Sequence, residues 1–188
     1  MNRKETTQFL SDLLIKTRLN GPSKYWASEV WLNYGRSGYE KRVDFMEFRP
    51  VGVTHQSDIE KGIFVCYEIK SCMGDLKSGH GMNFVGEKNY ICMPMSLWKE
   101  ITGIVRNHLQ DEKPIPDYIS KALSVGIMVP IPSSWEQIKT AGEEFENPTA
   151  LDTPKIEWEY HIIQTEPRSK RRDYSMSALL FWMLRAGK

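Results

Sequence analysis

Three polar residues near the middle of the chain have the types and the spacing that could hold a metal ion. Asp44 stands between two apolar residues, and Glu68 and Lys70 end an apolar run that starts at Ile63. Two neighbouring carboxylates repel each other and tend to take up a proton or a hard cation. Mg²⁺ binds one or two protein carboxylates and completes its shell with water and phosphate oxygens. Asp44 and Glu68 therefore indicate a Mg²⁺ or Mn²⁺ site that faces a phosphodiester.

Lys70 adds a positive charge beside such a site. Its ammonium group can stabilise negative charge that develops on the phosphate, or it can position the attacking water whose deprotonation the metal assists. Taken alone, the Glu-x-Lys spacing is a weak signal, because roughly one is expected by chance in a chain of this composition. The alternative interpretation is an ion pair at the end of a strand.

Two strands must position these residues. The residue pattern predicts strands over 42–49 and 63–70, joined by a long polar connection. Side chains two positions apart share one face of a strand, so we expect Glu68 and Lys70 to project together. If the two strands pair as a hairpin, Asp44 lies beside Glu68.

Further helices and strands are predicted around this hairpin. Ser23 is expected to cap a helix over 25–33, which carries Glu29. The segment 142–155 is acidic and contains proline, and we expect a mobile surface loop there. The periodicity predicts the other elements as helices over 4–19, 73–78, 96–109, 117–123 and 175–185, and strands over 89–93, 124–131 and 156–164.

This order of elements indicates a mixed α/β or α+β fold, in which helices flank a mixed sheet. The length of 188 residues and the 40% hydrophobic content fit a single domain over 1–188. We expect its core at about 22–131, preceded by an N-terminal helix and followed by a C-terminal extension of one strand and one helix.

The hairpin and the strands after it resemble the PD-(D/E)XK nuclease superfamily, in particular its small phage- and prophage-type members. The resemblance extends over about 25–130. Val43 stands where many members have proline, and the chain after Leu123 has no counterpart that we can assign. The matching segments are Arg-Val-Asp-Phe at 42–45, Phe-Val-Cys-Tyr-Glu-Ile-Lys-Ser at 64–71 with Asp75 downstream, Lys-Asn-Tyr-Ile-Cys-Met-Pro at 88–94, and Val-Gly-Ile-Met-Val at 125–129.

The resemblance implies a restriction-endonuclease-like core and Mg²⁺- or Mn²⁺-dependent hydrolysis of phosphodiester bonds. It implies that Asp44 and Glu68 are metal ligands and that Lys70 is the catalytic lysine. It also implies that the Ile69 carbonyl oxygen can bind the metal. Glu29 matches a helical glutamate that some members add to the metal shell, and the alternative for Glu29 is a solvated residue or an ion-pair partner.

Basic residues elsewhere could bind a nucleic acid. Lys88 precedes a predicted strand and could reach a phosphate, although a solvated lysine is an equal alternative. A second group of basic residues precedes the last predicted helix. Cations are unfavourable before a helix N-terminus, and a bound phosphate would relieve this unfavourable interaction. The tryptophans occupy mostly core-like positions, so the pattern identifies no exposed aromatic residues for stacking on bases. The basic cluster before the last predicted helix contains Arg168, Lys170, Arg171 and Arg172.

The composition limits the remaining choices. A net charge of +1 excludes a bulk nucleic-acid coat, so a polyanion must be bound locally. Three cysteines without a CxxC pair and a polar start predict a cytoplasmic protein. The apolar segment 178–184 is far shorter than the roughly 20 residues of a membrane span, so we expect no membrane partner. It could instead form a core helix or the face of a homodimer.

Two functions from different classes follow. The first is a metal-dependent nuclease that acts on a nucleic acid, with DNA expected before RNA. The alternative is a catalytically inactive nuclease-like module that binds nucleic acid or inhibits a host protein. The near-neutral charge and the acidic loop favour the second somewhat.

Overall fold

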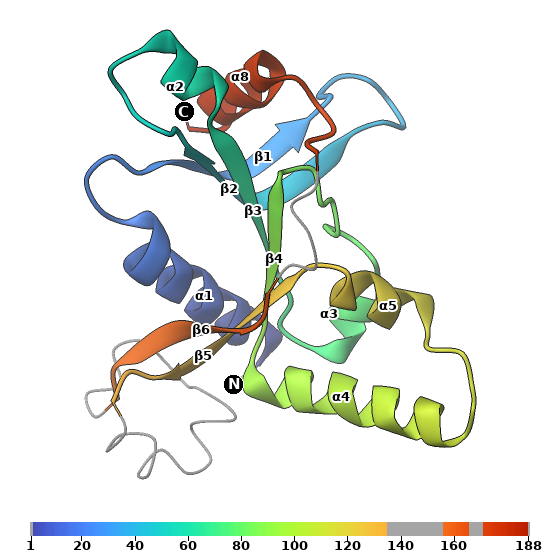
Figure 1. Ribbon diagram of the computed structural model, residues 1–188. Helices are drawn as coiled ribbons and strands as arrows, with labels where there is room; N and C mark the ends of the chain where they lie inside the picture. The colour runs from blue at the N-terminus through green and yellow to red at the C-terminus, as the bar shows by residue number, and fades with distance from the viewer. Residues whose placement is uncertain (1, 135–155, 166–170, 188) are drawn as a thin grey trace. The chain divides into compact units, whose positions relative to one another are not determined.

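The computed structural model describes residues 2–134, 156–165 and 171–187. In chain order its elements are α1 (Arg3–Leu14), a π-helical extension (Ile15–Leu19), β1 (Tyr25–Leu32), β2 (Lys41–Arg49), α2 (Gln56–Glu60), β3 (Ile63–Ile69), α3 (Met73–Lys77), β4 (Lys88–Cys92), α4 (Met95–Gln110), α5 (Asp117–Leu123), β5 (Gly126–Pro132), β6 (Trp158–Gln164) and α8 (Met176–Ala186) (Figure 1).

The strands form one six-stranded sheet in the order β1-β2-β3-β4-β5-β6. The pairs β1 with β2, β2 with β3, and β5 with β6 are antiparallel. Helices flank this sheet, which confirms the mixed α+β fold class. The restriction-endonuclease-like core stays a prediction.

The chain divides into two compact units. The first contains Met1–Arg18, Ile69–His80 and Ile91–Thr165, and the second contains Leu19–Glu68, Gly81–Tyr90 and Glu166–Lys188.

In the first unit, the apolar face of α1 packs on β6. The rings of Phe9 and Trp158 meet edge to face at 6.0 Å between centroids. The Tyr160 hydroxyl donates a hydrogen bond of 2.8 Å to the Leu10 carbonyl, and the Arg18 guanidinium donates one of 2.9 Å to the Tyr160 carbonyl. Buried leucines at i, i+3 and i+4 on α1 explain why this face is covered.

In the second unit, α8 packs across β1. Leu179 and Met183 of α8 are buried in one cluster with apolar residues of β1, β2 and β3. Ser175 caps the helix, because its hydroxyl accepts a hydrogen bond of 3.2 Å from the Ala178 N–H. The outer face of α8, with Phe181 and Leu184, is exposed, and the homodimer through this helix stays a prediction.

The predicted helix over 25–33 is wrong, because this segment is strand β1. Trp26, Val30 and Trp31 are of types that favour strands, and pairing with β2 over the whole segment overrides the helical spacing. Ser23 has a φ of 59° and lacks the extended backbone of an N-cap. The five-residue helix α2 was not expected, since it buries no side chain and leaves no apolar period in the sequence.

The other predicted elements over the described residues are confirmed within a few positions. The expected loop over 142–155 lies outside the described residues. None of the helices that the structure describes is long and apolar enough to span a membrane.

Candidate functional site

Asp44 and Glu68 lie just beyond the last pairs of β2 and β3. These pairs are Met46 with Cys66 and Phe45 with Tyr67. One further position along each antiparallel strand leads to Asp44 and Glu68. The expected pairing of the two strands is therefore confirmed, and both carboxylates belong to the second unit.

Glu68 is a fully buried carboxylate in an apolar setting. It follows Cys66 on the same strand by two positions. Burial raises the pKa of the Cys66 thiol far above its usual value, and the charge of Glu68 raises it further. Removing a carboxylate from water is costly unless a cation or hydrogen-bond donors compensate.

Glu29 occupies the position on β1 that is opposite Asp44. It lies between the pairs Ser28 with Phe45 and Val30 with Val43. Its φ of 53° is left-handed and interrupts the regular strand. Three carboxylates thus stand at successive register positions across β1, β2 and β3. The resemblance placed Glu29 on a helix, which is wrong, yet the strand brings it next to Asp44.

Arg42 supplies positive charge to this row. Its Nη1 lies 2.7 Å from Glu29 Oε2, and its Nη2 lies 3.6 Å from Asp44 Oδ1. Partial burial raises the pKa of the Glu29 carboxyl, Arg42 lowers it, and the charge of Asp44 raises it, with a net increase. The net increase comes from burial, because the attraction of Arg42 is larger than the repulsion from Asp44.

This donor set fits a hard cation in its chemistry. Asp44 and Glu68 provide the one or two carboxylates that Mg²⁺ takes from a protein. Over the ranges that the structure describes, no group of three or more His, Cys, Asp or Glu side chains is arranged to hold a metal ion. With Asp44 and Glu68 as protein ligands, water and substrate oxygens would fill the other positions.

Lys70 belongs to the first unit. The side chain is almost fully buried, and its Nζ donates a hydrogen bond to the His80 carbonyl. Asp75 Oδ1 lies 3.9 Å from the same Nζ, and Asp75 also pairs with Arg3 at 3.0 Å. The Lys70 N–H donates to the Cys92 carbonyl at 2.9 Å. The structure thus holds this lysine in a defined place within its unit. Its catalytic role stays a prediction, as does that of the Ile69 carbonyl.

The predicted basic cluster is only partly described. Arg168 and Lys170 lie outside the described residues. Arg171 is exposed, whereas Arg172 Nη1 lies 2.6 Å from Glu87 Oε1. A pocket of about 640 Å³ beside this ion pair is lined by Glu87, Arg171, Arg172, Asp173, Tyr174 and Ser175. Because Arg172 already has a carboxylate partner, it has less charge to offer a phosphate than the sequence suggested.

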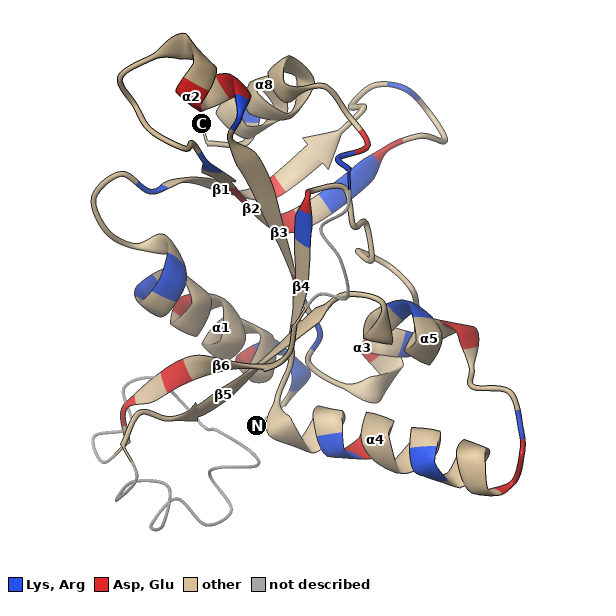
Figure 2. Cartoon of the chain, in the orientation of Figure 1, with Lys and Arg blue, Asp and Glu red and all other residues tan. Residues whose placement is uncertain are grey.

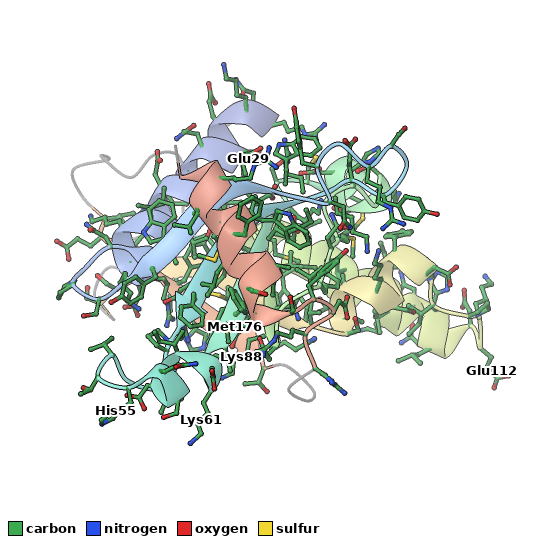
Figure 3. All side chains as sticks on the ribbon, turned by 90° about the horizontal axis from the view of Figure 1, so that it is seen from above. Glu29, His55, Lys61, Lys88, Glu112 and Met176 are labelled. Atoms are coloured by element: carbon green, nitrogen blue, oxygen red, sulfur yellow. The ribbon has the colours of Figure 1, made fainter. Side chains whose placement is uncertain are left out.

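Charged positions elsewhere in the second unit are visible along β2 and at the start of β4 (Figure 2). Lys88, the first residue of β4, is half-buried, and Figure 3 labels it. Its contact with a phosphate stays a prediction.

A buried polar network on β2 and β3 was missed by the sequence reasoning. Glu47 is buried, and its carboxylate accepts hydrogen bonds from Arg49 at 2.7 Å, the Tyr67 hydroxyl at 2.9 Å and Lys24 at 3.2 Å. The Tyr67 ring stacks on Tyr90 at 5.8 Å. The Glu-x-Arg spacing at 47–49, which puts both side chains on one face of a strand, is the signal that could have indicated it.

Comparison with known proteins supports the fold only. No protein-family model and no curated protein sequence matches the chain. Among solved structures, a protein of unknown function from Silicibacter pomeroyi, SPO1766, is similar with a TM-score of 0.50 and 13% identity. The match covers 96% of this chain and 84% of that one. At this identity the likeness indicates a shared arrangement of elements and says nothing of activity.

Proposed function

We propose that this protein is a metal-dependent nuclease that hydrolyses phosphodiester bonds of DNA or RNA. The observation that carries the proposal is the register of β2 and β3, because Asp44 and the fully buried Glu68 are the next residues after the last pair, Phe45 with Tyr67. Two carboxylates close to each other can bind a divalent cation together. A divalent ion that also binds phosphate oxygens would bring the substrate to the same place.

Asp44 and Glu68 are the residues that would hold the metal. When bound, Mg²⁺ or Mn²⁺ lowers the pKa of a coordinated water and polarises a phosphoryl oxygen. Arg42 keeps Glu29 and Asp44 oriented, since it contacts both. Glu29, whose pKa is raised, is suited to accept a proton near the site. Lys70, two residues after Glu68 in the sequence, is proposed to stabilise the charge that develops on the phosphate.

A cleavage assay with matched variants tests this proposal. Purified protein is incubated with labelled single-stranded and double-stranded DNA and RNA, in Mg²⁺, in Mn²⁺ and in EDTA. We expect cleavage that needs the metal and falls at least about 100-fold in Asp44→Asn and Glu68→Gln, since each removes an ionised ligand. Glu60→Gln, an exposed carboxylate of the same unit, is the control and should cleave as the wild type does. Cleavage that persists in Asp44→Asn and Glu68→Gln contradicts the proposal.

A second candidate is the inactive module that binds nucleic acid or a host protein. The observation that favours it is that Arg42 already neutralises part of the carboxylate row. Titration calorimetry with Mn²⁺ separates the two. Binding that Asp44→Asn abolishes supports the nuclease, whereas no binding, or binding unchanged in Asp44→Asn, supports the module.

A further inference from the structure

Exposed aromatic rings gather where β1 and β2 are joined in the second unit. Tyr34 and Tyr39, in the connection between the two strands, are each 61% exposed, and Trp31 near the end of β1 is 45% exposed. The rings of Trp31 and Tyr34 meet edge to face at 6.4 Å between centroids. The sequence pattern predicts a core-like position for Trp31, and its exposure shows that this prediction is wrong.

Arginine side chains lie over two of these rings. The guanidinium carbon of Arg36 is 4.8 Å from the centroid of Tyr39, and that of Arg185, on α8, is 4.9 Å from the centroid of Tyr34. A guanidinium covers one face of a ring and leaves the other face for a second flat group. The cations are therefore held beside the rings.

The connection between the strands is hydrogen-bonded within itself and to the segment before α8. Asn33 Nδ2 donates to the Tyr39 carbonyl at 3.3 Å and to the Tyr174 hydroxyl at 3.0 Å. The Gly35 N–H donates to Glu40 Oε1 at 3.0 Å. Gly35 has a φ of 83°, which glycine adopts without strain. The rings are thus presented by an ordered turn, which lowers the entropy lost when a ligand binds.

A small pocket of about 110 Å³ joins these rings to the carboxylate row. It is lined by Glu29, Trp31, Tyr34, Trp182, Arg185 and Ala186. Glu29 lies beside α8, as Figure 3 shows. Aromatic walls suit the face of a base, and the carboxylate can accept a hydrogen bond from an exocyclic amino group.

We propose that this surface, made of Trp31, Tyr34 and Tyr39 with Arg36 and Arg185, binds a single-stranded nucleic acid. Its rings would stack on unpaired bases, and its arginines would contact the neighbouring phosphates. In a duplex the base faces are covered by other bases, so the rings favour a single strand. The inference rests on the proposed nuclease function, because it names the substrate class and places the strand next to Glu29, the outer member of the carboxylate row.

Fluorescence anisotropy with a 20-nucleotide oligothymidylate tests the inference without any cleavage. The measurement is made in EDTA at low salt, with a duplex of equal length as the competitor. We expect the double substitution Tyr34→Ala/Tyr39→Ala to weaken binding of the single strand about 10-fold or more, since stacking on each ring contributes substantially. Tyr34→Phe/Tyr39→Phe keeps the rings and should bind within about 2-fold of the wild type.

Two controls separate stacking from other effects. Tyr25→Ala removes an exposed tyrosine at the far end of β1 and should leave binding unchanged. Arg36→Gln keeps both rings but removes one charge. It should weaken binding and make the logarithmic salt slope for a single strand shallower by about 0.7.

The inference is overturned if the wild type binds neither nucleic acid, if it prefers the duplex, or if the double alanine variant binds as the wild type does. It is also overturned if sedimentation shows that these rings hold two copies together and that the oligonucleotide does not compete. Binding without metal-dependent cleavage leaves the inference standing and contradicts the nuclease. If the double alanine variant binds as the wild type does and still cleaves with metal, the nuclease proposal stands and the inference about the aromatic surface is wrong.

Discussion

Glu47 shows how a single buried carboxylate can be stabilised in the second unit. Burial alone would raise its pKa, but hydrogen bonds from Arg49, Tyr67 and Lys24 outweigh burial, and the pKa is lowered. The folded protein therefore favours the ionised form more than the unfolded chain does. This contribution to stability is present above the ordinary glutamate pKa of about 4.5 and is lost as the pH falls through the lowered value.

Glu47→Gln should destabilise the protein by about 1–3 kcal/mol at pH 7, because it leaves the donors of Arg49 and Lys24 without a charged acceptor. Urea denaturation at pH 7 and pH 3 measures the effect. The difference from the wild type should shrink at pH 3, which is below the ordinary glutamate pKa, because the contribution of the ionised carboxylate is lost as the pH falls toward the lowered pKa. An equal difference at both pH values would contradict this assignment, and Glu60→Gln serves as the exposed control.

Among the elements, helix α4 has a C-terminal hydrogen-bonding pattern that the sequence does not reveal. The Lys113 N–H donates to the His108 carbonyl at 2.8 Å, and the Glu112 N–H donates to the Leu109 carbonyl at 3.4 Å. These two bonds close the helix in the manner of a Schellman motif, with Glu112 at a φ of 52°. That position is usually glycine, and Glu112, labelled in Figure 3, pays a steric cost there.

Glu112→Gly should therefore raise stability by about 0.5–1 kcal/mol, since glycine adopts this conformation without strain. Thermal denaturation should show an increase in Tm of a few degrees. Glu100→Gly, an exposed position inside α4, is the matched substitution and should lower stability by a similar amount, because glycine disfavours a helix interior. If both variants lose stability, the account of this helix end is wrong.

The sequence predicted the elements whose apolar periods are long or whose ends carry clear stop signals. The α1 leucines, the strands around Asp44 and Glu68, and helix α8 belong to this group. It failed for β1, where the apolar spacing fits both a helix and a strand and only the pairing with β2 decides. The ion pairs of Arg42 and Arg172 could not be predicted, because their partners come from other elements.

For the whole molecule, the net charge of +1 sets how a nucleic acid can be held. A chain without a large positive field must bind through a few local cations. If Arg36 and Arg185 are those cations, the logarithm of affinity for a single strand should fall with the logarithm of salt with a slope of about −1.4. A slope of −5 or steeper would show a broader basic surface than the one described.

The central claim is that Asp44 and Glu68 together hold a divalent metal. Crystals of the protein grown with Mn²⁺ test it most directly, through the anomalous signal of manganese. The account predicts a peak within coordination distance of both carboxylates, about 2.0–2.3 Å, which disappears in Asp44→Asn crystals. A peak only at other residues, or one that remains at Glu68 after Asp44→Asn, would contradict it.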